Sequence, residues 1–379
     1  MSSTSDPWNL GFRVPLPVRG DLGIGIIGAG FIVCDCHLPA YQDAGLRVVG
    51  LTSRTTAVAR EVAGLRGVPK VARSVEALLD DPAVELVDVA VPPREQGGII
   101  DRILAHPRRV RGILAQKPLA MSLVEARRIV STCAAAGIVL QVNQNMRYDP
   151  SVRALRTLID RGILGESVLA TIDMRAVPHW MSWAEGLGSL TTFLMSIHHI
   201  DTFRFWLGEP KYVMASTRPD PRTKFAHDDG INLYIFEYEN GARASSWDDV
   251  WNGPSCEGAA SELAVRWRFD GTSGTALGTV GWPAWPRREP STIAYSSGAD
   301  LGAWHRPHWP DTWFPDAFAG PMIGLINAVE TGATPDIGGL DNLRTIALCE
   351  AVRTAAREHR VVDFPREYPA EAFEATPAT

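Results

Sequence analysis

Two glycines in a short loop are the first residues of this chain whose types and spacing could do chemistry. Gly28 and Gly30 lie in the stretch GIGIIGAGFIVCDCHLPAY, directly after a short apolar run. Between a strand and a helix, the first glycine permits a tight turn and the second lets the backbone approach a diphosphate. The helix start supplies N–H donors, and Val33, in place of the usual third glycine, does not remove them. We therefore expect a nucleotide-binding loop, extending to Phe31 and Ile32, rather than an ordinary glycine turn.

The end of the second predicted strand bears on the choice of cofactor. Dinucleotide folds commonly place an acidic residue there to bind the adenosine ribose, whereas this chain has Thr52-Ser53-Arg54. Without that carboxylate a 2′-phosphate meets no repulsion, and Arg54 could pair with it. An exposed arginine at a strand end is also common. Ser53 and Arg54 are expected cofactor contacts, and both NAD and NADP stay open.

Strand-like and helix-like segments alternate between residues 21 and 142. Short apolar runs such as LGIGIIG, LRVVGLTS and LVDVAV are separated by segments with helical spacing. This alternation is typical of a parallel sheet covered by helices on both faces. We predict a doubly wound, dinucleotide-binding Rossmann domain at 21–142, preceded by an extended arm at 1–20.

The pattern changes after Tyr148. Runs that alternate apolar and polar residues, such as SVLATIDMRAV and INLYIFEYENGARASSW, are separated by Gly, Asn and Asp turns. This pattern predicts a large, mostly antiparallel sheet, interrupted by a helix at 191–207. The predicted fold class is therefore α/β, with a C-terminal α+β domain for substrate binding and oligomerisation at 143–367 and a polar tail at 368–379.

Composition limits the classes of partner. The chain has 379 residues and a formal charge of −6, without a basic stripe, so nucleic acid is not an expected partner. We expect no contact with a membrane, because no apolar run approaches the ~20 residues that span a bilayer. Five cysteines, an odd number, favour reduced thiols in the cytoplasm. Cys34-Asp35-Cys36-His37 lacks the spacing of a zinc site, and we expect no metal.

Three further segments, in order, resemble the family of glucose–fructose oxidoreductases and inositol dehydrogenases. Gln116-Lys117-Pro118 resembles the family's Glu-Lys-Pro motif. The stretch NQNMRYDPSVRALRTLIDRGILGE, residues 143–166, is similar to its link into the second domain, and SIHHIDTFRFWLGEP, residues 196–210, to its His-x-x-Asp helix. DNLRTIALCEAVRTAAREHRVVDF resembles the family's closing helix and strand, so the similarity extends over nearly the whole chain.

The resemblance implies a catalytic pair. It places Lys117 near the nicotinamide and the substrate, with Gln116 and Pro92 among the cofactor contacts, and it makes His198 the catalytic histidine. An imidazole can take the hydroxyl proton of a carbinol while hydride leaves for the nicotinamide. A nearby ammonium stabilises the developing negative charge. His199 competes for this role, but adjacent helical side chains diverge by about 100°.

The chain departs from the family's pattern at three positions. Leu194 stands where inositol-dehydrogenase-like members carry an Asp, four residues before the histidine. Gln116 replaces the Glu of Glu-Lys-Pro, and Gln96 replaces a His that often follows the Pro-Pro turn. The family's proton relay is therefore incomplete, or another group supplies it. Asp201 either orients His198 or fixes the helix.

Aromatic segments in the second half suit a carbohydrate pocket. Eleven of the twelve tryptophans lie at or after Trp180, and indole rings stack on the apolar C–H faces of sugars. Most of them are expected in the core or in an oligomer interface. The expected substrate contacts, which include basic groups suited to an anionic substituent, are Arg147, Arg175, Trp180, His199, Asp201, His305, Arg306 and His308.

We therefore expect an NAD(P)-dependent oxidoreductase that acts on a secondary hydroxyl of a sugar, cyclitol or glycoside. By resemblance it forms a homo-oligomer, a dimer or a tetramer. One alternative is an NAD-dependent glycosidase that works by transient ring oxidation, elimination, hydration and re-reduction. The other is a non-enzymatic nucleotide or sugar sensor, which the presence of both Lys117 and His198 disfavours.

Overall fold

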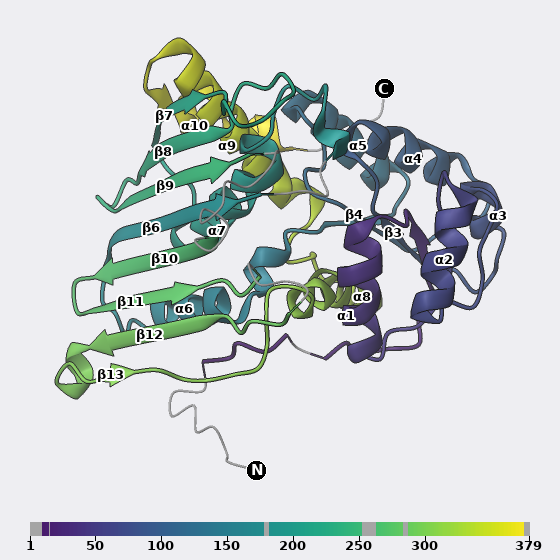
Figure 1. Ribbon diagram of the computed structural model, residues 1–379, viewed down its shortest axis with the longest axis horizontal. Coiled ribbons are helices and arrows are strands. Elements are labelled where there is room, and N and C mark those ends of the chain that lie inside the picture. Colours follow the sequence, from purple (N-terminus) through teal and green to yellow (C-terminus); the bar gives the residue numbers. More distant parts are fainter. Residues whose placement is uncertain (1–9, 15, 178–181, 252–262, 283–286, 375–379) are drawn as a thin grey trace. The chain divides into compact units, whose positions relative to one another are not determined.

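The computed structural model consists of two compact units (Figure 1). The N-terminal unit comprises residues 14–145, 315–347 and 370–379, and the C-terminal unit comprises 1–13, 146–314 and 348–369. Within these bounds the structure describes residues 10–14, 16–177, 182–251, 263–282 and 287–374.

A five-stranded parallel sheet forms the centre of the N-terminal unit, in the order β2-β1-β3-β4-β5. All strand residues are buried except the first of β2 and of β5, as expected for a parallel sheet between layers of helices. The predicted doubly wound domain is confirmed. The strands are β1 (Ile24–Ile27), β2 (Val48–Thr52), β3 (Leu86–Val89), β4 (Gly112–Ala115) and β5 (Val139–Val142).

Helices connect these strands in the expected alternation. Two of them begin at serines, because Ser74 Oγ accepts from Ala77 N–H and Ser122 Oγ accepts from Glu125 N–H, which satisfies donors that a helix start leaves unpaired. The helices are the π-helix η1 (Val33–His37) continued by α1 (Leu38–Asp43), then α2 (Thr56–Arg66), α3 (Val75–Leu79), α4 (Pro93–Ala105) and α5 (Leu123–Ala135).

A segment from the C-terminal part of the sequence completes the N-terminal unit. Residues 315–347 group with the parallel sheet, whereas the predicted boundaries assign them to the second domain. Helix α8 (Ala319–Thr331) packs on β4 and β5. At Gly112 a Cβ would come within 2.8 Å of Leu325 and 3.1 Å of Val329. An apolar helix carries no sequence signal that tells which sheet it covers.

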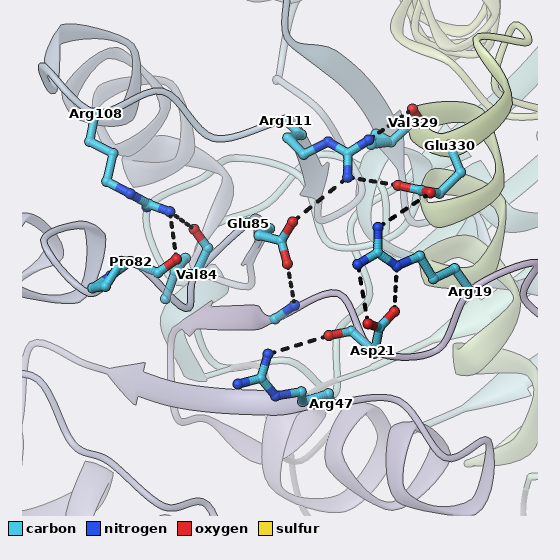
Figure 2. Close-up of polar contacts among 11 residues, drawn as sticks. Arg19, Asp21, Arg47, Pro82, Val84, Glu85, Arg108, Arg111, Val329 and Glu330 are labelled. Carbon is cyan, nitrogen blue, oxygen red and sulfur yellow. Dashed lines mark hydrogen bonds and ion pairs between the residues drawn. The ribbon is translucent and has the colours of Figure 1, made fainter.

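Ion pairs tie this helix to the amino ends of the strands (Figure 2). Arg111, which precedes β4, lies 2.6 Å from Glu330 of α8 and 3.7 Å from Glu85, which precedes β3. Arg19 pairs with Asp21 and lies 3.6 Å from the same Glu330. These side chains are partly exposed, so each pair contributes modestly. The network joins a late segment of the chain to the amino-end edge of the sheet.

The C-terminal unit contains a nine-stranded sheet in the order β13-β12-β11-β10-β6-β9-β8-β7-β14. Among these described strands every neighbouring pair is antiparallel except β6 and β9, so the predicted mostly antiparallel sheet is confirmed. The strands are β6 (Ser167–Ala176), β7 (Tyr212–Arg218), β8 (Ile231–Glu237), β9 (Arg243–Val250), β10 (Ala264–Gly271), β11 (Gly274–Thr279), β12 (Thr292–Ser297), β13 (Trp304–His305) and β14 (Val362–Asp363).

Helices cover one face of this large sheet (Figure 1). Trp267 of β10 donates its indole N–H to Ser151 Oγ at 3.0 Å and packs edge-on against Trp206, with ring centroids 5.5 Å apart. Ser151 and Trp206 belong to different helices, which the sheet therefore holds side by side. These are α6 (Pro150–Asp160) and α7 (Ile197–Leu207); α9 (Gly339–Glu358), divided between the units after Ala347, and α10 (Phe364–Glu367) follow later in the chain.

Two features are absent from the described residues, a membrane-spanning helix and a metal-binding cluster. No helix there has both the length and the apolar character that crossing a bilayer requires. The same residues contain no cluster of three His, Cys, Asp or Glu side chains arranged to hold a metal ion. Cys34, Cys36, Cys133 and Cys349 are free thiols.

Candidate functional site

The glycine loop after β1 has the form of a diphosphate cradle. Gly28 has φ +124°, and a Cβ there would lie 2.2 Å from the carbonyl oxygen of Ala90, so the turn accepts only glycine. At Gly30 a Cβ would meet no described atom within 4 Å, which leaves space in front of the backbone. Helical structure starts directly afterwards, at the half-buried Phe31 and Ile32. The loop therefore fits the diphosphate of a dinucleotide, held at a helix start.

The end of β2 presents an exposed cation. Ser53 is half-buried, and the side chain of Arg54 is 85% exposed, with Nη1 3.1 Å from Oε1 of Glu95. Glu95 lies in the first turn of α4, which Pro92 precedes as the N-cap residue. An ion pair this exposed is weak. Arg54 can therefore exchange Glu95 for an anionic ligand group.

The turn that carries Lys117 is held by a glutamine side chain. Gln96 Nε2 donates to the carbonyl oxygens of Gln116 at 2.8 Å, Pro118 at 3.0 Å and Leu119 at 3.0 Å. Gln96 Oε1 accepts from Gln116 N–H at 2.8 Å, and Gln116 Oε1 accepts from Lys117 N–H at 2.8 Å. The Lys117–Pro118 peptide bond is cis. Gln96, one of the departures from the family's pattern, thus fixes the backbone around Lys117.

The glycine loop and Lys117 lie at one edge of the parallel sheet. Gly28 directly follows β1 and Lys117 lies two residues beyond β4, and these strands flank β3 in parallel register. The carboxyl ends of parallel strands meet at the same edge, where doubly wound folds bind their ligands. The sequence therefore brings two of its predicted site elements to the edge where cofactors bind.

A buried polar network at this edge was not predicted. His37 Nδ1 lies 2.6 Å from Asp88 Oδ2, to which Tyr41 also donates its O–H at 2.8 Å. His37 Nε2 lies 3.0 Å from Asn143 Nδ2 and 3.4 Å from Gln116 Nε2. The sequence indicated only that the segment ending at His37 is no zinc site, because its partners come from strands far away in the chain.

A second residue that sequence reasoning missed follows β5. Gln144 is 1% exposed. Neither its Oε1 nor its Nε2 has a hydrogen-bond partner in the part of the chain that the structure describes. A buried amide without partners is costly, and this one follows a strand that ends at the ligand-binding edge. Three consecutive amides, Asn143-Gln144-Asn145, after an apolar strand were the signal for it.

His198 lies against an aromatic cluster in the C-terminal unit. The residue belongs to α7 and is 5% exposed, and its ring packs edge-on against Trp313, with centroids 5.1 Å apart at 88°. Trp313 in turn contacts Phe314 at 4.8 Å and Trp282 at 6.2 Å between ring centroids. The histidine predicted to be catalytic is thus buried against aromatic side chains.

The neighbouring His199 has structural partners. Its Nδ1 lies 3.0 Å from Oδ1 of the fully buried Asp248 on β9. Asp248 also accepts hydrogen bonds from Ser246 Oγ, at 3.0 Å, and from Ser196 Oγ. This network joins α7 to the sheet, and it explains why His199 and His198 have different surroundings although they are adjacent in sequence.

Arg147 and Asp201 contact each other. Arg147 Nε and Nη2 donate to the two carboxylate oxygens of Asp201, at 2.6 and 2.7 Å, and Arg204 Nη1 lies 3.6 Å from the same carboxylate. This geometry agrees with Asp201 fixing its helix. Leu194, at the family's Asp position, is buried in the π-helix η4 (Thr192–Ser196) that precedes α7.

Arg175 belongs to a second cluster in the C-terminal unit. Its Nε lies 3.3 Å from Asp249 Oδ2. Both Arg175 and Arg222 place a guanidinium over the ring of Trp251, at 5.6 and 4.0 Å from its centroid. Arg222 also pairs with Asp249. Trp180, another predicted substrate contact, lies outside the described residues.

The predicted contacts at 305–308 lie on and after the edge strand β13. His305 stacks on Tyr295, with centroids 5.0 Å apart, and its Nε2 pairs with Asp300. Arg306 and His308 are exposed. His305 therefore takes part in packing at the sheet edge, whereas the sequence placed it on a loop.

The chain is similar to known oxidoreductases along most of its length. Residues 22–144 match the GFO/IDH/MocA model described as "Oxidoreductase family, NAD-binding Rossmann fold", and residues 152–277 match the GFO/IDH/MocA C-terminal domain. The D-apiose dehydrogenase of Paraburkholderia graminis is 25% identical over 89% of this chain and 88% of its own. The inositol 2-dehydrogenase of Rhizobium meliloti is 26% identical over 89% and 98%.

Solved structures share the fold. An oxidoreductase from Agrobacterium radiobacter, crystallised with NAD+, L-tartaric acid and magnesium, superposes with a TM-score of 0.75. It is 24% identical, and the match covers 92% of this chain and 99% of that one. At this sequence identity the match shows the fold alone.

Proposed function

The chain belongs to the GFO/IDH/MocA family of NAD-binding oxidoreductases, and on this premise we propose a specific reaction. The protein moves a hydride between NAD or NADP and a secondary hydroxyl of a sugar, cyclitol or glycoside. Its relatives include dehydrogenases of D-apiose and of inositol, so the chain is an enzyme of the sugar and cyclitol dehydrogenase type.

One observation carries the proposal for this chain. The Gly28 loop and the clamped turn at Lys117 lie at the same edge of one parallel sheet. A diphosphate held at Gly30 requires the space that the structure leaves there. A nicotinamide bound in this way would accept or donate the hydride. The loop and the turn are thus suited to holding a dinucleotide with its reactive end near Lys117.

Each of the two proposed catalytic residues has a defined task. Lys117 holds the substrate oxygen and stabilises the negative charge that develops on it. His198 takes the hydroxyl proton during oxidation and returns it during reduction. Its aromatic surroundings exclude water and offer apolar surface to a sugar ring. Neither task requires an aspartate at position 194.

The reaction can be tested with nicotinamide absorbance. The protein is mixed with NAD+ or NADP+ and a panel of sugars, cyclitols and glycosides, and formation of the reduced nicotinamide is followed. We expect turnover with at least one panel member, a loss of about 100-fold or more in Lys117→Ala and His198→Ala, and unchanged cofactor binding by calorimetry in His198→Ala. Cofactor binding without turnover of any panel member would contradict the proposal.

A transient-oxidation glycosidase is the second candidate, because Leu194 removes the aspartate of the dehydrogenase relay. In this reaction a ring hydroxyl is oxidised, the aglycone is eliminated, water adds, and the ring carbonyl is reduced again. The cofactor is restored at each turnover. Release of a chromogenic aglycone that needs only catalytic NAD would favour this reaction over net dehydrogenation.

We also propose that the chain forms a homo-oligomer through the face of the large sheet opposite α6 and α7. Leu233 and Ile235 of β8, Trp247 of β9 and Leu277 of β11 are between 42% and 48% exposed. Leu233 and Trp247 are register partners, and an apolar patch of this kind marks an interface. Sedimentation should show a dimer or tetramer, and Trp247→Glu should dissociate it while the exposed control Val124→Glu does not.

A further inference from the structure

The imidazole of His37 joins the carboxyl ends of three adjacent parallel strands. Its Nδ1 contacts Asp88 of β3, and its Nε2 contacts Gln116, directly after β4, and Asn143, directly after β5. The ring itself comes from the helix that follows the glycine loop, and it is fully buried. One side chain thus connects the cofactor loop to the turn of Lys117.

The donor and acceptor roles of the groups around the His37 ring indicate which ring nitrogen carries the proton. Asp88 Oδ2 already accepts from Tyr41 O–H, so Nδ1 is the donor toward this carboxylate. Gln116 Oε1 accepts from Lys117 N–H, which leaves Gln116 Nε2 facing the ring. The ring's Nε2 therefore faces an amide donor and acts as an acceptor.

Asn143 leads to the same conclusion independently. Its Oδ1 accepts from Asn145 Nδ2 at 3.2 Å, so its own Nδ2 is the atom 3.0 Å from His37 Nε2. Two amide N–H groups directed at one ring nitrogen are compatible only with an unprotonated nitrogen. The hydrogen-bond geometry therefore assigns the ring proton to Nδ1 and makes Nε2 an acceptor.

We propose that His37 is a positioning residue for Lys117, acting through Gln116. With its Nδ1 proton bound to Asp88, the ring accepts from the Gln116 amide and fixes the orientation in which Gln116 Oε1 holds the Lys117 backbone. The amide donor of Gln116 and the acceptor Nε2 of His37 form a matched pair. A carboxylate at position 116 would place an acceptor opposite the lone pair of Nε2, and it would require a second proton on the ring.

The protonation pattern can be tested without cofactor or substrate. The protein is labelled with ¹⁵N-histidine, and the ring nitrogens are read by long-range ¹H–¹⁵N correlation near neutral pH. We expect His37 with a protonated Nδ1 and an unprotonated Nε2 in the natural chain, and with both nitrogens protonated in Gln116→Glu. His37→Asn assigns the signal, or, if that variant does not fold, the shift caused by Tyr41→Phe assigns it.

Kinetics test the positioning role, and this part rests on the proposed function. His37→Gln and Gln116→Glu should each lower kcat about tenfold, the effect of one lost orienting hydrogen bond, with a change of less than about twofold in the KM for the cofactor. Tyr41→Phe removes a bond to Asp88 and a 3.5 Å contact with His37 Nδ1, but none to Gln116. It should lower the melting temperature and leave kcat within about twofold.

His106 provides the matched control. It is a buried histidine of the same unit, with Nε2 3.3 Å from Asp80, and His106→Gln should leave kcat unchanged. The proposal is overturned if Nε2 of His37 is protonated in the natural chain, or if it stays unprotonated in Gln116→Glu. It is also overturned if kcat falls in proportion to the loss in melting temperature in all three variants, which are Tyr41→Phe, His37→Gln and His106→Gln. Failure of every sugar to react would contradict the proposed function and leave the spectroscopic result standing.

Discussion

Arg147 binds the carboxylate of Asp201 with two parallel hydrogen bonds, at 2.6 and 2.7 Å. The side chains are 11% and 2% exposed. The pair ties the 3-10 helix η2 (Asn145–Tyr148), which follows β5 in the chain, to α7, which carries His198. Its geometry is that of a fixed bidentate pair. The aspartate of the His-x-x-Asp pattern therefore anchors the helix that carries His198.

Removal of Asp201 should destabilise the protein strongly. Asp201→Ala leaves the largely buried Arg147 without this carboxylate, and breaking a largely buried pair in this way costs about 3–5 kcal/mol. Denaturant unfolding of the variant measures that loss. Asp160→Ala serves as the control, because Asp160 pairs with Arg156 at an exposed i,i+4 position on α6 and should cost about 1 kcal/mol or less. Equal losses in both variants would contradict the anchoring role.

Burial of Asp149 should make stability depend on pH. Burial raises the pKa of this carboxyl to about 6, although hydrogen bonds from Ser151 and Ser291 oppose the shift. Because the folded protein holds the proton more tightly than the unfolded chain, this group stabilises the fold at low pH, and the contribution is lost as pH rises through about 6. Relative to the ordinary aspartate pKa of 3.8, the loss amounts to about 3 kcal/mol.

Asp149→Asn tests this prediction. Asparagine still caps α6, where Asp149 accepts from Ser151 N–H and Val152 N–H, but it does not titrate. The unfolding free energy of Asp149→Asn minus that of the natural chain should increase as the pH rises from about 4 to about 7. A difference that does not change with pH would show that the carboxyl titrates normally.

Much of the fold could be predicted from the sequence because its strands and helices each show a characteristic spacing of apolar residues. The apolar runs that became β1 to β5 and the alternating runs that became β6 and β8 indicated their sheets directly. Two features had no local signal. β9 lies parallel to β6 within an otherwise antiparallel sheet, and α8 packs on β4 and β5. Both depend on partners distant in sequence.

The site was predictable to the extent that single residues define it. The glycine loop and Lys117 could be proposed from the sequence because turn geometry and motif order mark them. His37, Asp88 and Asn143 were missed, because each is an ordinary buried residue until three strands bring them together. The same limit explains why the packing of His305 was not predicted, because its partner Tyr295 comes from the neighbouring strand.

The two glycines of the loop should respond differently to alanine. A Cβ at Gly28 would collide with the Ala90 carbonyl, so Gly28→Ala should unfold more readily. Gly30→Ala should fold normally, because nothing described lies near its Cβ, but the added methyl occupies the proposed diphosphate space. We expect its melting temperature to be unchanged and its NAD affinity, measured by calorimetry, to fall at least about tenfold. Undiminished affinity in Gly30→Ala would exclude the loop as the diphosphate cradle.

Removal of the Gln144 amide should raise the stability of the protein and weaken ligand binding. Its buried amide has no partner among the described residues, and such a group costs about 1–3 kcal/mol. Gln144→Met keeps nearly the same shape without the polar atoms, so it should raise the melting temperature of the ligand-free protein. If the amide serves a bound hydroxyl or carboxamide, the same variant should weaken binding of cofactor or substrate by about tenfold or more.

Gln144→Glu is the matched polar control, and it should lower the melting temperature because an unpaired buried carboxylate is costlier still. A methionine variant that gains stability and binds both ligands as tightly as the natural chain would exclude Gln144 from the site, and one that gains no stability would show that the amide is already satisfied.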